Sequence, residues 1–71
     1  MSIEEIRSYR NAKPFEPFVI FMSDGRAIHV VARTRLGIAP WGKVGVFEGT
    51  SFHLLAPAEI SRVQTGFLPR E

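Results

Sequence analysis

The sequence predicts a small, mainly β domain in which one N-terminal helix precedes five or six short antiparallel strands. Three observations lead to this fold class. The chain has 71 residues, 45% of them hydrophobic, which is enough for one core and too little for a second domain. Helical spacing of apolar residues is confined to about the first dozen positions. From about residue 17 to residue 65, β-branched and aromatic runs alternate with turn residues. We therefore expect a single domain over residues 1–71.

The helix is predicted over about residues 2–12. Ser2 and Glu5 form a capping-box pattern, in which each side chain bonds the other residue's backbone N–H. Apolar side chains then recur at helical spacing at Ile3, Ile6 and Tyr9. Pro14 cannot continue a helix and also restricts the residue before it, so the helix should end near Asn11 or Ala12.

A β-hairpin is predicted over residues 18–32. An apolar run at 18–22 leads into Asp24-Gly25, a strong hairpin signal, and then into a second apolar run at 27–32. Both faces of the first strand are apolar, which indicates a strand covered on both sides. We expect the core on one side, and the N-terminal helix or a partner subunit on the other. Self-association should use this outer face or the strand edges.

The remaining strands follow from the turn residues between them. Strands are predicted at 36–39, 44–47, 52–55 and 60–65, with turns at 40–43 and 49–51, a helical turn at 56–59 and a loosely held tail at 66–71. Pro57 suits the first position of that helical turn.

Composition excludes several classes of protein. The longest fully apolar run, residues 18–22, is far shorter than the roughly 20 residues of a transmembrane helix. The opening residues lack the basic flank and apolar stretch of a signal peptide, so we expect a cytoplasmic protein with no membrane contact. The absence of cysteine excludes disulfides and Cys-based metal sites.

Positive charge gathers in the middle of the chain. The net charge is +2, whereas residues 24–47 alone sum to +3. This segment contains the candidate nucleic-acid or partner-binding residues Arg33, Arg35, Trp41 and Lys43. An exposed aromatic residue among cations is typical of single-strand binders. The alternatives are that Trp41 packs over the core or in a subunit contact, and that the two arginines form a solvated strand edge.

No catalytic constellation is apparent. His29 and His53 fall in predicted strands between apolar neighbours, so a strand-face or core position is favoured over metal ligation, for which Asp24, Glu48 or Glu59 would have to serve as a third ligand. Asp24 before Gly25 is explained as a turn former, in a turn expected to be of type I′. We predict a protein that is not an enzyme and that uses no cofactor, metal or small-molecule substrate. The alternative is a small enzyme or ligand-binding subunit that uses His29 or His53.

The order of elements resembles that of small SH3-like barrels. FVIFMSDGRAIHV is similar to the first half of the Sm-like signature, and FHLLAPAEISRVQ to the second half. The segment IEEIRSYRNAKPFEPFVIFMSDGR resembles more closely the opening of a group of short uncharacterised bacterial proteins, with a Pro-Phe-x-Pro-Phe element before a DGR turn. That second resemblance implies no activity.

The Sm-like resemblance implies an SH3-like/Sm-like barrel that assembles into a ring and binds RNA. The family's RNA-binding residues are not matched. Residues 55–58 read Leu-Ala-Pro-Ala where the family has an Arg-Gly pair or a Tyr-Lys-His run, and residues 33–35 lack the expected Asp and Asn. The resemblance therefore favours the barrel and a homo-oligomer more than it favours RNA. We predict a non-enzymatic oligomeric interaction module of unknown partner, with single-stranded RNA as one candidate.

Overall fold

The protein is a mainly β domain with one N-terminal helix, as predicted. The computed structural model describes residues 1–66. Helix α1 (Ile3–Arg10) precedes six strands: β1 (Phe18–Met22), β2 (Ala27–Val30), β3 (Leu36–Ile38), β4 (Val44–Glu48), β5 (Ser51–Leu55) and β6 (Ile60–Thr65). Short 3-10 helices precede β3 (η1, Arg33–Arg35) and β6 (η2, Pro57–Glu59). Apart from Gly66, the expected tail lies outside the described residues.

Helix α1 begins with the predicted capping box. The Glu5 backbone N–H donates to Ser2 Oγ at 3.2 Å, and the Ser2 N–H donates to Glu5 Oε1 at 2.9 Å. These bonds satisfy backbone donors that have no partner within the helix. At the other end, the Asn11 N–H donates to the Arg7 carbonyl at 2.9 Å, and Asn11 is the C-cap. The helix therefore ends one to two residues before the predicted limit.

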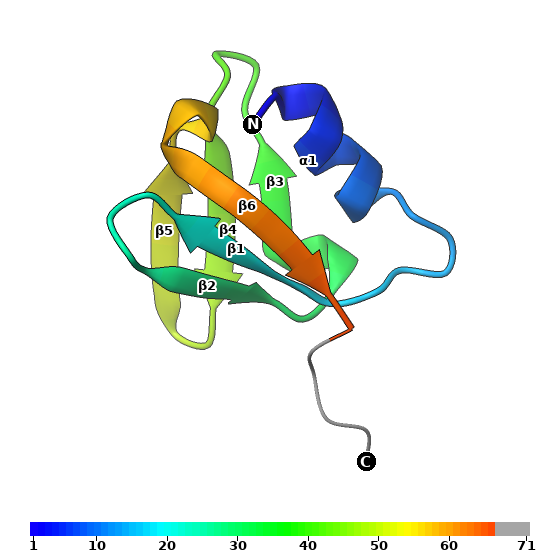
Figure 1. Cartoon of the computed structure of the whole chain (residues 1–71). Helices are drawn as coiled ribbons and strands as arrows, with labels where there is room; N and C mark the ends of the chain where they lie inside the picture. The colour runs from blue at the N-terminus through cyan, green and yellow to red at the C-terminus, as the bar shows by residue number, and fades with distance from the viewer. Residues whose placement is uncertain (67–71) are drawn as a thin grey trace.

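The strands form two three-stranded antiparallel sheets. Their orders are β2-β1-β6 and β3-β4-β5. In Figure 1, β6 passes in front of the second sheet, so that the strands of the two layers cross. Within residues 1–66 the two sheets are separate hydrogen-bonded units and do not close into a barrel. The barrel predicted from the sequence therefore stays a prediction.

The core lies between the two sheets. Its buried members are Ile6, Phe18, Ile20, Met22, Ile28, Val30, Leu36, Val44, Val46, Leu55 and Ile60. Helix α1 closes one side of this core, beside β3 in Figure 1, and inserts Ile6, which is fully buried. The Tyr9 and Phe15 rings pack against Phe18 with centroids 5.5 and 5.9 Å away. Arg10 Nε donates to the Leu36 carbonyl at 2.8 Å and ties the helix to β3.

The outer side of β1 is not covered by the N-terminal helix, which was one of the two covers expected from the sequence. Helix α1 packs on the core side of the molecule instead. Val19 is nevertheless buried, and the Arg62 guanidinium lies over the half-buried Phe21 ring at 4.0 Å from its centroid. The outer face of β1 therefore offers little apolar surface to a partner.

The β1–β2 hairpin forms where predicted, with a different turn. The Gly25 N–H donates to the Met22 carbonyl at 3.0 Å, and the Met22 N–H donates to the Arg26 carbonyl at 2.8 Å. Gly25 has φ +96°, whereas no non-glycine residue among the described ones has a positive φ. A type I′ turn would need a positive φ at Asp24, so the loop is the three-residue kind that ends in a left-handed glycine.

Candidate functional site

The β3–β4 turn places Trp41 at the surface. Its hydrogen bonds repeat those of the β1–β2 hairpin: the Gly42 N–H donates to the Ala39 carbonyl at 3.0 Å, and the Ala39 N–H donates to the Lys43 carbonyl at 2.8 Å. Gly42 has φ +89° and so closes the turn without steric cost. Trp41 therefore sits at the tip of a short loop, and 72% of its surface is exposed.

Of the other three predicted site residues, only Lys43 shares this turn. Arg33 and Arg35 lie in η1, at the opposite end of β3. The Arg33 side chain points back to helix α1: its Nε donates to the Arg10 carbonyl at 2.9 Å, and its Nη2 donates to the Ala12 carbonyl at 2.7 Å. These bonds satisfy carbonyls at the end of the helix. Arg35 is exposed.

The outer face of the β3-β4-β5 sheet is apolar from strand to strand. The residues that alternate outward are Gly37 on β3, Gly45 and Phe47 on β4, and Phe52 and Leu54 on β5. The three large side chains among them are 52%, 55% and 58% exposed, respectively. Together with Trp41, they are four of the five large hydrophobic side chains described as exposed, the fifth being Val31. We call Trp41 and these five outward residues the aromatic face.

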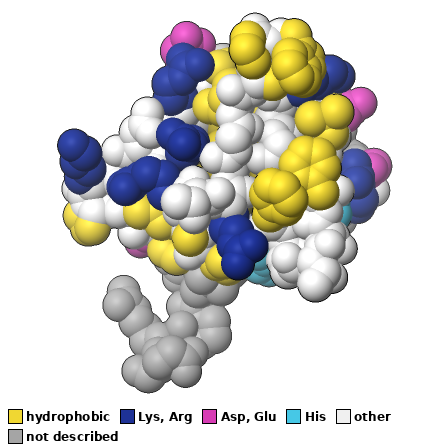
Figure 2. Space-filling view, turned by 180° about the vertical axis from the view of Figure 1, so that it is seen from behind, with side chains coloured by type: hydrophobic (Ala, Val, Ile, Leu, Met, Phe, Trp, Pro, Cys, Tyr) yellow, Lys and Arg dark blue, Asp and Glu magenta, His cyan; other side chains and the backbone are white. Residues whose placement is uncertain are grey.

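The aromatic face surrounds an open hollow of about 390 Å³. Gly37 carries no side chain, and a Cβ built there would meet nothing within 4 Å, so the sheet backbone is uncovered at this position. Phe52 leans over Gly45, because a Cβ built there would come within 3.0 Å of the Phe52 ring, and Phe47 packs on Phe52 with ring centroids 4.9 Å apart. Figure 2 shows hydrophobic side chains gathered on this side of the molecule, with Lys and Arg side chains beside them.

Of the aromatic face, only Trp41 was singled out from the sequence. The signal for the others is the alternation in residues 44–48 and 51–55, where each face carries large apolar residues: Phe47, Phe52 and Leu54 on one face, and Val44, Val46 and Leu55 on the other. Such a pattern does not show which side of the sheet faces the core. Pairing with β3, and the packing of this sheet on β1, decide that question.

A second cluster joins the two sheets through Glu48. The His29 backbone N–H and its Nδ1 each lie 2.9 Å from Glu48 Oε2, and His53 Nε2 lies 3.1 Å from Glu48 Oε1. A carboxylate only accepts, so each of these ring nitrogens carries the proton. The His29 backbone N–H, and next its ring, hold the pKa of Glu48 below its usual range. In the sequence, Glu48 is only one of three carboxylates that could join the two histidines, and no local pattern predicts that all three side chains meet.

This His29–Glu48–His53 cluster bridges strands of different sheets, since His29 is on β2 and the other two residues lie on β4 and β5. Its contacts connect β2 to β4, which also pack against each other. In the part of the chain that the structure describes, no group of three or more His, Cys, Asp or Glu residues is placed to hold a metal ion. Through its hydrogen bonds the cluster forms a polar joint between the two sheets.

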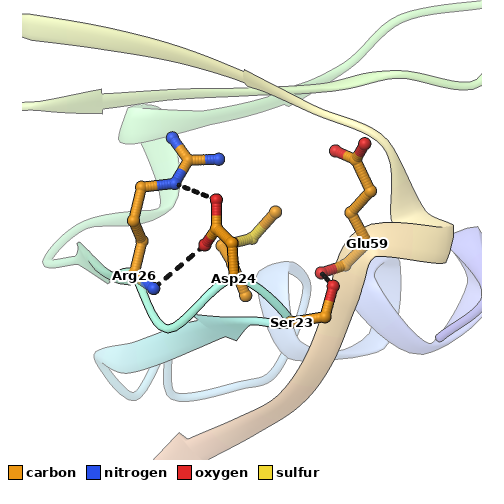
Figure 3. A pocket seen from close by; sticks show the side chains of 5 residues that line it. Ser23, Asp24, Arg26 and Glu59 are labelled. Carbon is orange, nitrogen blue, oxygen red and sulfur yellow. Dashed lines mark hydrogen bonds and ion pairs between the residues drawn. The ribbon is translucent and has the colours of Figure 1, made fainter.

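A small polar pocket lies under the β1–β2 turn, against η2 (Figure 3). The Ser23 N–H and Oγ both donate to the Glu59 carbonyl, at 2.8 and 3.0 Å. The Asp24 carboxylate accepts from the Arg26 backbone N–H at 3.0 Å and from Arg26 Nε at 2.9 Å. These bonds, the backbone one first, lower the pKa of Asp24. They explain Asp24 as a residue that shapes the turn.

Comparison with family models, with curated proteins and with solved structures finds no match for this chain. The described helices include none long and apolar enough to span a membrane. The resemblances noted in the sequence stay predictions.

Proposed function

We propose that the protein is a non-enzymatic interaction module that binds a partner through the aromatic face. The observation that carries this proposal is the gathering of four large apolar side chains, each more than half exposed, around one hollow. A fully exposed aromatic side chain has a surface of about 150–250 Å². The four side chains together therefore expose roughly 400–500 Å² of apolar surface to water. Apolar patches of this size on small monomers commonly mark binding sites.

The polar contacts of the other two clusters have structural explanations, because one cluster links the two sheets and the other shapes the β1–β2 turn. Glu48 is engaged by both imidazoles, and Asp24 by Arg26. The alternative of an enzyme or ligand-binding subunit requires His29 or His53 to act on a bound molecule, at the expense of the joint between the sheets. Replacing Glu48 by Gln should then alter binding or turnover, whereas a module that uses the aromatic face should keep its partner.

A photo-crosslinking experiment tests the proposal in the cells that produce the protein. Phe47 or Phe52 is replaced by p-benzoyl-phenylalanine, which keeps an aromatic ring at the face. The control carries the same group at Val31, which is 51% exposed and lies outside the face. We expect a discrete adduct from both face positions and none from position 31. Equal or absent crosslinking at all three positions would contradict the proposal.

Single-stranded RNA is a second candidate partner, favoured by the presence of Lys43 in the same turn as the exposed Trp41. Anisotropy of labelled oligo-U and oligo-A at two salt concentrations tests it. If RNA binds here, Trp41→Ala should cost about 1–3 kcal/mol of binding free energy through lost stacking. Lys43→Ala should reduce the salt slope by about one. Folded protein that binds neither oligonucleotide at low salt would eliminate this candidate.

The finer predictions from the sequence belong to the same proposal. The return of β6 to the side of β1 after η2 supports an SH3-like or Sm-like relation. A cytoplasmic location rests on the sequence expectations alone.

A further inference from the structure

We infer that a second copy of this chain docks on the aromatic face, so that two β3-β4-β5 sheets pack face to face about a two-fold axis. This inference rests on the proposed function, because it names the partner of the same surface. It differs from the expectation that self-association uses strand edges or the outer side of β1. That side is largely covered within the monomer, whereas the aromatic face is open.

The aromatic face has the shape that a two-fold contact requires. In such a contact the same patch meets itself, so the patch must hold both projecting and recessed parts. Trp41 projects from the turn, and the Phe47 and Phe52 rings form a tilted pair, at 51° to each other, on the same face. Gly37 leaves the recess, since a Cβ there would meet nothing within 4 Å, whereas the Phe52 ring covers Gly45. Aromatic side chains of one copy can therefore enter the hollow of the other.

The charge on the face also suits a second copy. The residues that line the hollow are Gly37, Ile38, Ala39, Pro40, Trp41, Gly45, Phe47, Phe52 and Leu54, and none of them is charged. Two identical faces can thus meet without opposing like charges or burying an unpaired one. Nucleic acid would find little to neutralise its phosphates here, because the hollow offers no cation and Arg33 is engaged by helix α1.

The available area matches a weak dimer. The total surface of the described chain is 4640 Å², and the four large side chains contribute roughly a tenth of it. With their smaller neighbours in both copies, face-to-face docking buries roughly 1,000–1,200 Å² in total, at the lower limit of specific interfaces. Stacked sheets lie about 10 Å apart, which leaves room for one interdigitated layer of these side chains. We expect a dissociation constant on the order of 10–100 μM.

Trp41 reports on this contact directly, because it is the one tryptophan of the chain. Sedimentation equilibrium and Trp41 emission are measured on the same samples, from well below to well above the expected dissociation constant. The mass should rise from the 8.0 kDa of one chain towards twice that value. Over the same concentrations the emission should shift to the blue as Trp41 loses contact with water.

Two variants locate the contact. Leu54→Lys places a charge in the face and should weaken the dimer about 100-fold, with Trp41 emission that stays red-shifted. Val31→Lys makes the same kind of change at an exposed apolar residue outside the face, and should associate as the natural chain does. Circular dichroism verifies that both variants are folded. Should Leu54→Lys unfold, Phe47→Lys serves in its place.

A mass of one chain at every concentration, with Trp41 emission unchanged, would overturn the inference. So would a dimer that Leu54→Lys leaves intact, since that dimer would use another surface. The proposed function has a separate outcome. A monomer whose aromatic face still crosslinks to a different molecule in cells would disprove the second copy as partner and keep the interaction module.

Discussion

The two arginines of η1 show how residues of one type, two positions apart, take different roles. Arg33 donates to two carbonyls at the end of helix α1, and its guanidinium lies 5.6 Å from the centroid of the Phe15 ring. Arg35 is exposed at the end of the same turn. The sequence placed both in one candidate binding patch, because spacing alone does not show which arginine faces the helix.

Arg33→Ala should therefore lower the free energy of unfolding by about 2–3 kcal/mol, since two bonds from a charged group to partly buried carbonyls are lost. Arg35→Ala, an exposed substitution, should change it by no more than about 0.5 kcal/mol. Urea denaturation followed by circular dichroism measures both. Equal effects would show that Arg33 does not hold the helix.

Gly42 has a specific structural role, because its backbone, with φ +89°, closes the turn that carries Trp41. Gly42→Ala should destabilise the fold by about 1 kcal/mol or more, since a side chain strains this left-handed conformation. Gly37→Ala is the matched control. It adds the same methyl group in open space with no positive φ, and should be nearly neutral in dilute, monomeric protein. Melting temperatures of the natural chain and of the two variants measure these effects.

At the scale of elements, the hairpins and the helix were predictable because their determinants are local. The capping box starts α1, and the glycine-ended loops join β1 to β2 and β3 to β4. The 3-10 helix at Arg33–Arg35 was not predicted. Its three residues carry no turn-forming Gly or Pro, and its geometry is supported by tertiary bonds from Arg33 to the helix.

The contact between the two sheets should depend on pH through Glu48. Bonds from His29 and His53 hold the pKa of this carboxyl below its usual range. The pKa of Glu48 is thus lower in the folded chain than in the unfolded chain, where a Glu carboxyl titrates at about 4.3. The stabilisation is therefore present above about pH 4.3 and is lost as the pH falls through the pKa of the folded state. The joint between β2 and β4 should therefore weaken in acid.

Glu48→Gln removes the titrating group and keeps one acceptor oxygen. We expect the variant to be less stable than the natural chain by about 1 kcal/mol near pH 7. The gap should shrink below about pH 4, where the natural carboxyl also becomes neutral. Urea midpoints from pH 3 to pH 7 give the two curves. Parallel curves across that range would mean that Glu48 is not bound in the folded state.

For the molecule as a whole, helix α1 completes the core. Without Ile6, the side of the core between the two sheets would be left open, since Ile6 is the fully buried residue of this helix. Ile6→Ala should cost about 2–5 kcal/mol through the cavity it leaves. A domain of this length holds only about 4–11 kcal/mol in total, so the effect is large.

The control for Ile6→Ala is Ser8→Ala, an exposed change on the same helix that should have little effect. Chemical denaturation of both variants provides the comparison. If the two substitutions lower the free energy of unfolding equally, the helix would lie on the surface of the sheets and would not form part of the core.

The sequence by itself determined the class of fold, the helix and the positions of all six strands, because capping, apolar periodicity and turn chemistry act over a few residues. It also pointed to Trp41, through the Pro and Gly that flank it. Tertiary structure alone decided which apolar face is buried. Strands that carry large apolar residues on both faces, such as 44–48 and 51–55, are ambiguous until their neighbours are placed.

The same limit explains the polar contacts. Glu48 meets His29 across 19 positions of sequence, and Arg33 reaches Arg10 across 23. Such pairs depend on how the two sheets and the helix pack, which no local pattern encodes. Because of this packing, Arg33, predicted to bind a partner, instead binds the end of helix α1. The two histidines meet at Glu48 and link the sheets. The packing also leaves an apolar face open on the second sheet, because the core of so small a domain can cover only one side of each sheet.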